Sequence, residues 1–403
     1  MSRIKWFKLL LICLLLSNTS YILYTLSLNG FFLNLYYLFC EVIVFVATLI
    51  LLQNIGRFLR IRKRYEPIVI TSIVLFIVWQ LCSCYLNGML RGSVVARILC
   101  WPMVFLAIYA LNLCEEDFTG IRKIVNFSCV FLAVLCVPLI YTHLFIMQRA
   151  GAVIFPTYLV LSMIPLLLLV NKKENAYKII ILILIFMAIT TKRSGFFVAV
   201  VSLAVYYLFD NGMNISLNKK IERILKIAIM GVLAAFLLFV ASKFVDISII
   251  DRILEMKEDG GSGRNDIWSM VLLYYKNLRT HYQIVGRGYE GVSRYVMPQG
   301  KALSAHNDFL EVLFDYGKIG ISLFVIIWLA LIGYVKILRK SKYFSYALII
   351  IISMFMLAMF SYLFIQSFVI QYYMIALSLI MRLHIERRKD NSGEGNISYC
   401  SNI

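Results

Sequence analysis

Apolar runs of about 20 residues recur along almost the whole chain, separated by short polar breaks. A bilayer core of about 30 Å requires roughly 20 apolar residues for each helix that crosses it. Because this core contains no water, the backbone N–H and C=O groups must pair within the segment, as they do in an α-helix. Segments of alternating polarity, which a membrane β-barrel requires, are absent from the sequence. The pattern predicts an all-α polytopic membrane protein.

We expect about 12 transmembrane helices, because twelve apolar windows of this kind are present. They lie near residues 7–27, 31–53, 67–87, 95–114, 124–145, 152–170, 178–191, 194–210, 226–244, 318–337, 345–364 and 367–383. When the N-terminus is placed in the cytoplasm, the basic stretches 57–64, 219–223 and 336–342 also fall on the cytoplasmic side. Lysine and arginine gather in cytoplasmic loops, so this orientation is favoured, and it makes both termini cytoplasmic.

This orientation leaves one long stretch, residues 245–317, on the external side. It is too rich in apolar residues for disorder, and loops of this length inside a compact fold are usually functional. We therefore expect one long, partly helical external loop that forms a cap on the outer membrane face. The chain then divides into N-terminal transmembrane helices (1–176), further transmembrane helices with a hairpin tip (177–244), the external loop (245–317), C-terminal transmembrane helices (318–383) and a polar cytoplasmic tail (384–403) that we expect to be largely disordered.

The composition agrees with a membrane protein and accounts for the strong positive charge. The chain of 403 residues has 62% hydrophobic and 15% charged residues, whereas soluble domains have about 25% charged residues. A net charge of +19 is consistent with nucleic-acid binding, but cytoplasmic loops explain most of it, so we expect no nucleic-acid partner. The nine cysteines show neither a disulfide framework nor zinc spacing.

Several cations depart from the charge rule because they fall on or near the external side. They are Arg91, Arg97, Arg149, Lys192, Arg193, Arg264, Arg279, Arg287 and Arg294. Lys192 and Arg193, in TKRSG, separate two apolar runs so narrowly that they mark the tip of a hairpin. Their side chains either face a cavity or partner or extend to external headgroups. The sequence leaves this open, together with the roles of Glu41, Arg91, Arg97 and Arg149.

Two glycine-rich motifs lie in the external loop. In GGSGRNDIW, glycines allow a close approach to a ligand, and Trp268 lies four residues after Arg264, within reach if a helix starts at Asn265 or Asp266. The same residues also fit a flexible turn, a helix cap and an arginine stacked on tryptophan. VGRGYEG, at 285–291, lacks the strand and helix of a dinucleotide site, so we expect its glycines to form a turn.

The stretch SAHNDFLEVLFDYGKIG, at 304–320, places His306 just before a short helix that re-enters the membrane. Asp308 and Glu311 have the spacing of a capping box, and Gly317 is well placed to end the helix. A histidine with a pKa of about 6.5 is mostly neutral at pH 7 and can accept a proton, with Asn307 orienting it or binding a sugar hydroxyl. A capping or interfacial histidine is the alternative.

The acidic residues of this stretch do not suggest a second type of chemistry. Asp308, Glu311 and Asp315 share one helix face, where we expect solvation rather than the carboxylate pair of a glycosidase. The external side has no Asp-x-Asp and no cluster of histidine and carboxylate. We therefore expect no metal site and no cofactor.

Taken in order, TKRSG, SGRNDIW, GRG and AHNDFLEVLFDYGKIG resemble the motifs of the bacterial O-antigen ligase and polymerase superfamily, which includes Wzy-type polysaccharide polymerases. The resemblance covers about residues 177–337. It implies a glycosyltransferase that takes its glycan from undecaprenyl pyrophosphate on the outer face of the bacterial cytoplasmic (inner) membrane. It also implies that Arg193 and Arg264 hold the pyrophosphate and that His306 activates the acceptor hydroxyl.

A metal-independent, inverting transfer follows from this resemblance if the acceptor displaces the pyrophosphate in one step. We expect substrate binding to involve Lys192, Trp268, Arg287, Arg294 and Asn307. The expected partners are the lipid-linked glycan donor, a glycan acceptor, membrane lipids, and chain-length regulator and flippase proteins.

We favour a polymerase of O-antigen, capsule or exopolysaccharide because the chain ends in a short tail without an added periplasmic domain. An O-antigen ligase that transfers the glycan to lipid A core or to protein is the alternative. A flippase or transporter would also fit twelve spans, but transporters usually keep charges at the midplane, whereas here they gather at the outer face. The sequence does not determine the sugar, linkage, repeat unit, chain length or oligomeric state.

Overall fold

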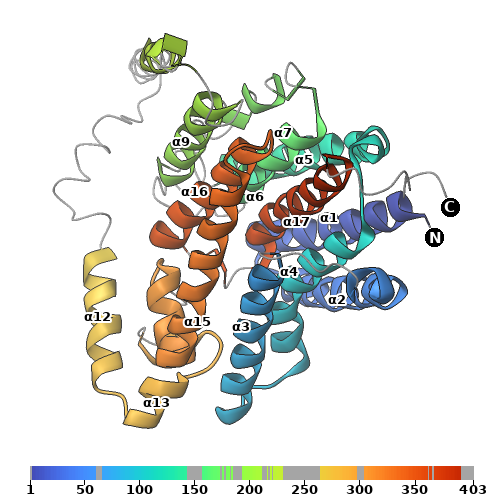
Figure 1. The fold of residues 1–403 in the computed structure, drawn as a ribbon. Helices are drawn as coiled ribbons and strands as arrows, with labels where there is room; N and C mark the ends of the chain where they lie inside the picture. The colour runs from blue at the N-terminus through green and yellow to red at the C-terminus, as the bar shows by residue number, and fades with distance from the viewer. Residues whose placement is uncertain are drawn as a thin grey trace.

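The computed structural model describes most of the chain, and its described residues form helices joined by turns (Figure 1). These residues are 2–59, 66–142, 157–172, 175–176, 178–181, 183–184, 193–210, 216, 218–219, 221–229, 264–296, 304–361, 363–364 and 367–391. The predicted all-α architecture is therefore confirmed for the described part of the chain.

The helices have the following bounds: α1 Arg3–Ser27, α2 Gly30–Leu59, α3 Glu66–Leu86, α4 Gly92–Leu111, α5 Phe118–Tyr141, α6 Thr157–Ser162, α7 Ile164–Val170, α9 Arg193–Phe209, α12 Arg264–Lys276, α13 Thr280–Val285, α14 Gly291–Tyr295, α15 Asp308–Leu338, α16 Phe344–Phe360 and α17 Ser367–Asn391, with a 3-10 turn, η1, at Glu115–Asp117. Among the described residues, seven helices are long and apolar enough to cross a membrane: α1–α5, α15 and α17. Shorter apolar helices occupy Tyr158–Val170, Phe197–Phe209 and Phe344–Phe360. The chain is a multi-pass membrane protein.

The predicted number of twelve spans stays a prediction, because the windows near 178–191 and 226–244 lie largely outside the described residues. The other windows correspond to helices. The window at 318–337 is the second part of α15, and α17 continues to Asn391, past the predicted end of its span at residue 383.

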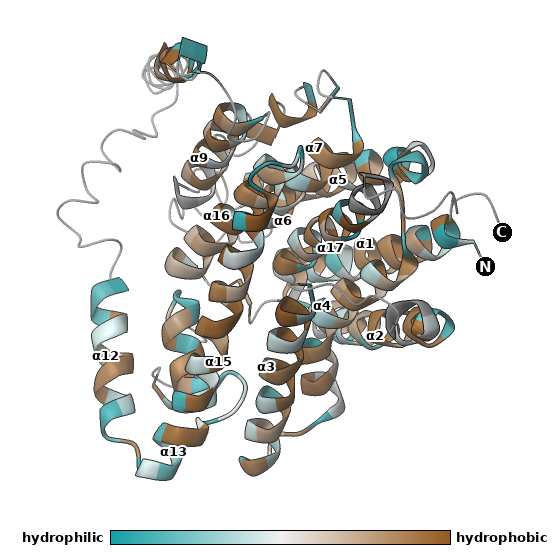
Figure 2. Ribbon diagram, in the orientation of Figure 1, coloured by the Kyte–Doolittle hydropathy of each residue, from teal (hydrophilic) through white to brown (hydrophobic). Residues whose placement is uncertain are grey.

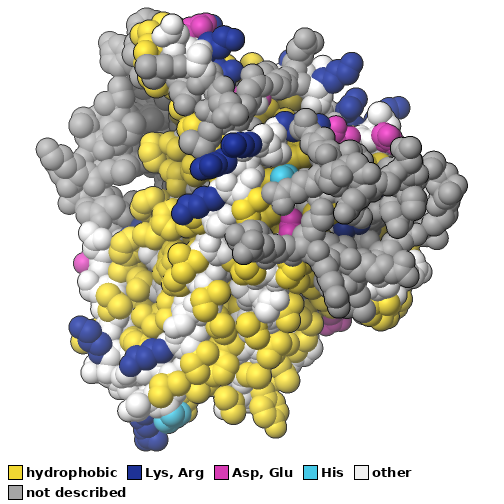
Figure 3. Space-filling model, in the orientation of Figure 1, with side chains coloured by type: hydrophobic (Ala, Val, Ile, Leu, Met, Phe, Trp, Pro, Cys, Tyr) yellow, Lys and Arg dark blue, Asp and Glu magenta, His cyan; other side chains and the backbone are white. Residues whose placement is uncertain are grey.

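Hydrophobic residues cover the outside of the helix bundle as well as its core. Figure 2 shows that α3 and α16 are mostly hydrophobic, whereas α12 is mixed. Large apolar side chains remain exposed, for example Phe45 and Leu329, each at 63%. In Figure 3 hydrophobic side chains cover much of the lower half of the face shown, and Lys and Arg side chains lie mainly above this area or at its edge. Such a surface is suited to contact with lipid.

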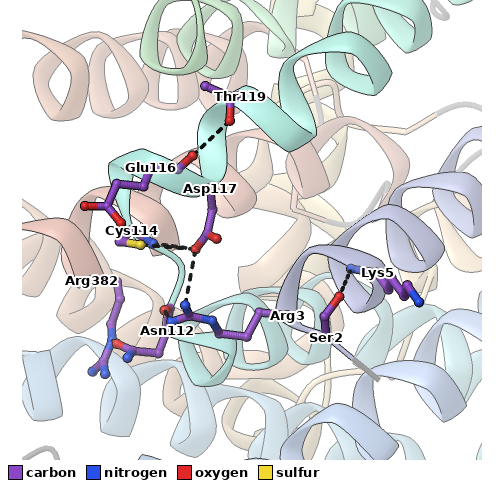
Figure 4. Close-up of polar contacts among 9 residues, drawn as sticks. All are labelled: Ser2, Arg3, Lys5, Asn112, Cys114, Glu116, Asp117, Thr119 and Arg382. Atoms are coloured by element: carbon purple, nitrogen blue, oxygen red, sulfur yellow. Dashed lines mark hydrogen bonds and ion pairs between the residues drawn. The ribbon is translucent and has the colours of Figure 1, made fainter. Parts of the chain in front are cut away.

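A polar cluster joins the start of α1, the turn after α4 and the end of α17 (Figure 4). Arg3 donates to the backbone oxygen of Asn112 at 2.8 Å and lies 3.9 Å from the Asp117 carboxylate. Arg382 donates to the Asn112 side chain. The Asp117 carboxylate also accepts from the Cys114 N–H at 3.0 Å. Elements far apart in the sequence are thus held together at this end of the bundle.

Helix α15 is folded back on itself at Gly317, which has φ 68° and ψ −166°. The rings of Phe309 and Phe324 are 5.2 Å apart, and those of Phe309 and Trp328 are 6.3 Å apart. A straight helix would separate Phe309 from Phe324 by about 22 Å. Helix α15 is therefore a hairpin of two antiparallel helices, which we call the first segment (308–316) and the second segment (318–338).

Helices α12, α13 and α14 pack with the first segment of α15 into a small unit at the edge of the molecule (Figure 1). We call the described residues 264–296 and 304–316 the cap. A separate hydrophobic cluster holds it together: Val271, Tyr275, Val292, Val296, Ala305 and Phe314. The predicted loop is thus partly helical, with its own core, in the described residues. Its place on the outer membrane face stays a prediction.

Candidate active site

His306 lies in the turn that immediately precedes the first segment of α15, as predicted, and Gly317 ends that segment. The backbone of His306 is left-handed, with φ 51°. Histidine is among the residues that adopt this conformation more often than most, but at some cost in energy. Such a conformation persists only where the surroundings hold it, and residues of this kind cluster at functional sites.

The peptide next to His306 is held from both sides. The Glu311 carboxylate accepts from the Ala305 N–H, and Trp268 Nε1 donates to the Ala305 oxygen at 2.8 Å. Ala305 is completely buried. Because both polar groups of this residue are paired, the turn that carries His306 has little freedom to move.

Asn307, rather than Asp308, caps the helix. Its side-chain oxygen accepts from the N–H groups of Phe309 at 3.0 Å and Leu310 at 3.2 Å. The predicted capping box of Asp308 and Glu311 is therefore wrong by one residue. This oxygen serves the cap, so a substrate contact of Asn307 would have to use its amide nitrogen.

The three acidic side chains of the first segment are buried, so the prediction that they are solvated is wrong. Asp308 and Asp315 are 0% exposed and Glu311 is 3% exposed. Asp315 accepts from the Val292 N–H at 3.2 Å, in α14. Their spacing correctly placed them on one face, but the hairpin and the rest of the cap enclose that face. These carboxyl groups hold neighbouring segments in place.

Asp308 joins the His306 turn to the connection between α16 and α17. Its carboxylate accepts from the N–H groups of Leu363 at 2.8 Å and Phe364 at 3.1 Å. The ring of Phe364 also packs on Trp328 in the second segment, at 5.8 Å. The end of α16 and the start of the first segment therefore lie side by side.

Arg264 is the first residue of α12, one or two residues before the predicted start at Asn265 or Asp266. Trp268 lies four residues further on, so the two side chains share a helix face and differ by about 6 Å along the axis. Because Trp268 holds Ala305, Arg264 lies about one helical turn from the contact with the His306 turn. Within the described residues, the Arg264 guanidinium makes no hydrogen bond, ion pair or stack on Trp268. The alternative of a stacked arginine is not observed.

Arg193 is the first residue of α9, which runs antiparallel to α16. The hydroxyl groups of Ser202 and Ser353 are 2.6 Å apart, and the rings of Phe209 and Phe344 are 5.7 Å apart. Residues nearer the start of α9 therefore lie beside residues nearer the end of α16. Continued to Arg193, this pairing places its backbone beside the last residues of α16. The Arg193 side chain and Lys192 lie outside what the structure describes.

The last residues of α16 lead into the connection that Asp308 holds, so the start of α9, with Arg193, runs toward this connection. The start of α12, with Arg264, is joined through Trp268 to Ala305, the residue before His306. A helix start carries the positive end of the helix dipole, and any N–H groups that are not capped there add to its attraction for anions. In the first segment of α15, Asn307 already accepts from two of these N–H groups. The arrangement is suited to binding an anionic group beside a histidine that can accept a proton.

Arg287 and Arg294 do not lie beside the His306 turn. The Arg287 N–H donates to the Phe314 oxygen at 3.0 Å, near the end of the first segment, so its backbone is about 10 Å along the helix axis from the His306 turn. Arg294 lies in α14, and its guanidinium is 2.7 Å from Met89 Sδ in the turn between α3 and α4. The structure thus joins Trp268 to the residue before His306, whereas Arg287 and Arg294 contact other parts of the molecule.

The glycines of the GRG motif form the predicted turn. Gly286 has φ 88° and Gly288 has φ 79°, which side chains rarely adopt. A Cβ on Gly286 would overlap the backbone carbonyl of Asp315. The motif is therefore required for close packing of two backbones, at the point where the first segment of α15 ends.

Arg97 anchors this turn to α4, a role that the sequence left open. Its guanidinium pairs with Glu290 at 2.8 Å and stacks on the rings of Tyr289 at 4.6 Å and Tyr37 at 5.0 Å. Burial raises the pKa of Tyr289 above its usual range, so this ring stays neutral. The sequence signal for this role was the position of Arg97 inside a predicted membrane span, because a cation in such a span usually has a partner.

The other residues left open give little further information. Arg91 precedes α4 and is exposed. Glu41 in α2 is exposed and makes no ion pair within the described residues, and Arg149 lies outside them. No group of three or more metal-binding side chains occurs in the part of the chain that the structure describes.

Comparison with known proteins agrees with the sequence motifs. The family model described as O-antigen ligase matches residues 178–325. This stretch contains α9, α12–α14 and the first segment of α15, so it includes Arg193, Arg264 and His306. No curated protein matches the chain. Residues 178–325 are thus similar to the O-antigen ligase family, in agreement with the motifs that resemble the O-antigen ligase and polymerase superfamily.

Proposed function

We propose that the protein is a membrane glycosyltransferase that polymerises undecaprenyl-pyrophosphate-linked repeat units into O-antigen, capsule or exopolysaccharide. The observation that supports the proposal is the contact of Trp268, one helical turn after Arg264, with the residue before His306, inside the stretch that matches the family. The site would face the outer side of the bacterial inner membrane, with both termini in the cytoplasm. Chain-length regulator and flippase proteins would work beside it.

In this mechanism the two arginines bind the pyrophosphate of the donor. Guanidinium groups donate paired hydrogen bonds to phosphate oxygens, and helix starts add further N–H groups. As the bond between the anomeric carbon and the pyrophosphate oxygen breaks, negative charge grows on the leaving group. Fixed donors that stabilise this growing charge accelerate the reaction. The arginine pair would thus serve where other transferases use a metal ion.

His306 supplies the base. The acceptor hydroxyl attacks the anomeric carbon on the side opposite the leaving group, its proton passes to the His306 ring, and the configuration is inverted. The contacts of Trp268 and Glu311 with Ala305 support this role, because they hold the turn in place before substrate binds. Trp268 would then act by positioning His306, while Lys192 and the Asn307 amide nitrogen would contact the substrate.

A ligase that transfers the glycan to lipid A core or to protein is the second candidate, since the matching family model is described as O-antigen ligase. The chemistry at the donor is the same in both. A deletion strain separates the two candidates. Loss of a polymerase leaves single lipid-linked repeat units, whereas loss of a ligase leaves long lipid-linked chains.

The direct test is reconstitution of the purified protein in nanodiscs with a defined lipid-linked repeat unit. Arg193→Ala, Arg264→Ala and His306→Ala are each expected to lower the transfer rate by about a hundredfold or more, the usual cost of losing such a contact. Arg279→Ala is the matched control, because Arg279 is an exposed arginine of the same cap with no side-chain bond to the helix that it precedes. Wild-type rates in all three variants would refute the proposal.

A further inference from the structure

The guanidinium of Arg287 lies against two tyrosine rings. Its central carbon lies 4.1 Å from the ring centre of Tyr282, in α13, and 3.9 Å from that of Tyr295, in α14. Contact with two aromatic rings stabilises the cation and restricts its movement. The five N–H donors of a guanidinium point outward in its plane, so they remain able to bind an acceptor.

Within the described residues, these donors have no partner. The neighbouring Glu290 is paired with Arg97 at 2.8 Å, and Asp315 accepts from the Val292 N–H. Arg287 Nε is buried without an acceptor. Leaving a charged donor unpaired in a buried place is unfavourable, whereas a fixed guanidinium matches a carboxylate or phosphate with two parallel hydrogen bonds.

The position of Arg287 separates it from the proposed reaction centre. His306 and the contact between Trp268 and Ala305 lie at the start of the first segment of α15, whereas the Arg287 backbone N–H donates to Phe314, about 10 Å further along. A pyrophosphate bound beside His306 occupies the other end of the segment. An anion on Arg287 therefore belongs to a different part of the substrate.

We propose that Arg287, clamped by Tyr282 and Tyr295, forms a second anion subsite that binds an acidic sugar of the glycan. The bound group is the carboxylate of a uronic acid or a phosphate substituent on a sugar. This inference rests on the proposed function, because it takes the substrate to be a glycan. It assigns the protein to acidic polysaccharides and makes Arg287 a specificity-determining residue.

The test is binding of short saccharides to the full-length protein in phosphatidylcholine nanodiscs, measured by calorimetry. The probes are trigalacturonate, galactose 6-phosphate and neutral galactotriose. Wild-type protein is expected to bind at least one acidic probe more tightly than galactotriose, and the two acidic probes distinguish carboxylate from phosphate. Arg287→Gln is expected to weaken that binding about 10- to 100-fold, as for the loss of hydrogen bonds to a charged group. Arg287→Lys, which keeps the charge without the paired donors, should fall between.

Controls separate this proposal from a general loss of structure and from the reaction mechanism. Arg279→Gln removes another cationic side chain of the cap and should leave binding unchanged. His306→Ala should abolish transfer but keep wild-type affinity for the acidic probe. If His306→Ala still transfers glycan, the proposed function fails while the subsite stands. Equal affinity of wild type for acidic and neutral probes, or unchanged acidic binding in Arg287→Gln, would overturn the subsite.

Discussion

Replacing Gly317 by alanine tests the hairpin on which the candidate site depends. The backbone at Gly317 lies in a region that only glycine adopts readily, and a side chain there costs about 1–3 kcal/mol. A Cβ would also overlap the Ile284 carbonyl and approach the Gly286 nitrogen. Both are backbone atoms, which move less easily than a side chain, so overpacking adds about 1–3 kcal/mol. We expect a total loss of about 2–6 kcal/mol.

The free energy of unfolding is measured by denaturant titration of the purified protein in micelles, with tryptophan fluorescence as the signal. Trp79 Nε1 donates to the Tyr316 oxygen at 2.8 Å, so this ring reports directly on the bend. Gly333→Ala is the matched control on the same helix, because a Cβ there would have no neighbour within 4 Å. Alanine in a helix interior is favoured over glycine by about 0.5–1 kcal/mol, so this control should be neutral or slightly stabilising.

A Gly317→Ala protein as stable as Gly333→Ala would contradict the expected loss of stability. It would mean that residue 317 does not adopt the observed backbone conformation. The antiparallel packing of the two segments of α15 would then be wrong. The position of His306 beside the connection between α16 and α17 would fall with it.

Two further changes test how the His306 turn is held. Trp268→Phe keeps an aromatic ring but removes the donor to Ala305. The transfer rate should therefore fall about tenfold, equivalent to about 1.4 kcal/mol, with little change in KM. Trp328→Phe is the control and should keep the wild-type rate, because the Trp328 indole nitrogen has no partner within the described residues. Asn307→Ala should cost about 1 kcal/mol of stability through loss of the helix cap, and Asn307→Asp should restore it. If Asn307→Asp is stable but inactive in the transfer assay, the amide nitrogen contacts substrate.

Much of the fold is predictable because membrane helices obey strong local rules. Apolar windows predicted the helices, and the spacing of Asp308, Glu311 and Gly317 predicted a short helix to within one residue of its start. The glycines of GRG were correctly assigned to a turn. These features depend on the chain near each residue, so neighbouring residues are enough to predict them.

The burial of the acidic residues could not be predicted from their neighbours in the sequence. Asp308 and Asp315 look like a solvated pair in the sequence, but both are completely buried. Their helical spacing determines which face they share, but not what covers it. Leu363 and Val292, which provide the partners, are distant in the sequence. The same limit explains why Arg287 and His306 looked like parts of one site, whereas the structure separates them.

The sequence by itself determined that this is an all-helical membrane protein, and its motifs pointed to the superfamily, because both depend on local residue order. How these motifs are placed relative to one another depends on the tertiary structure. The bend at Gly317 packs the first segment of α15, which follows His306, against the second segment. The antiparallel packing of α9 on α16 directs Arg193 toward the connection between α16 and α17, and Trp268 joins α12 to Ala305, the residue before His306. Long-range packing of this kind depends on the shapes of surfaces that come together only when the chain folds.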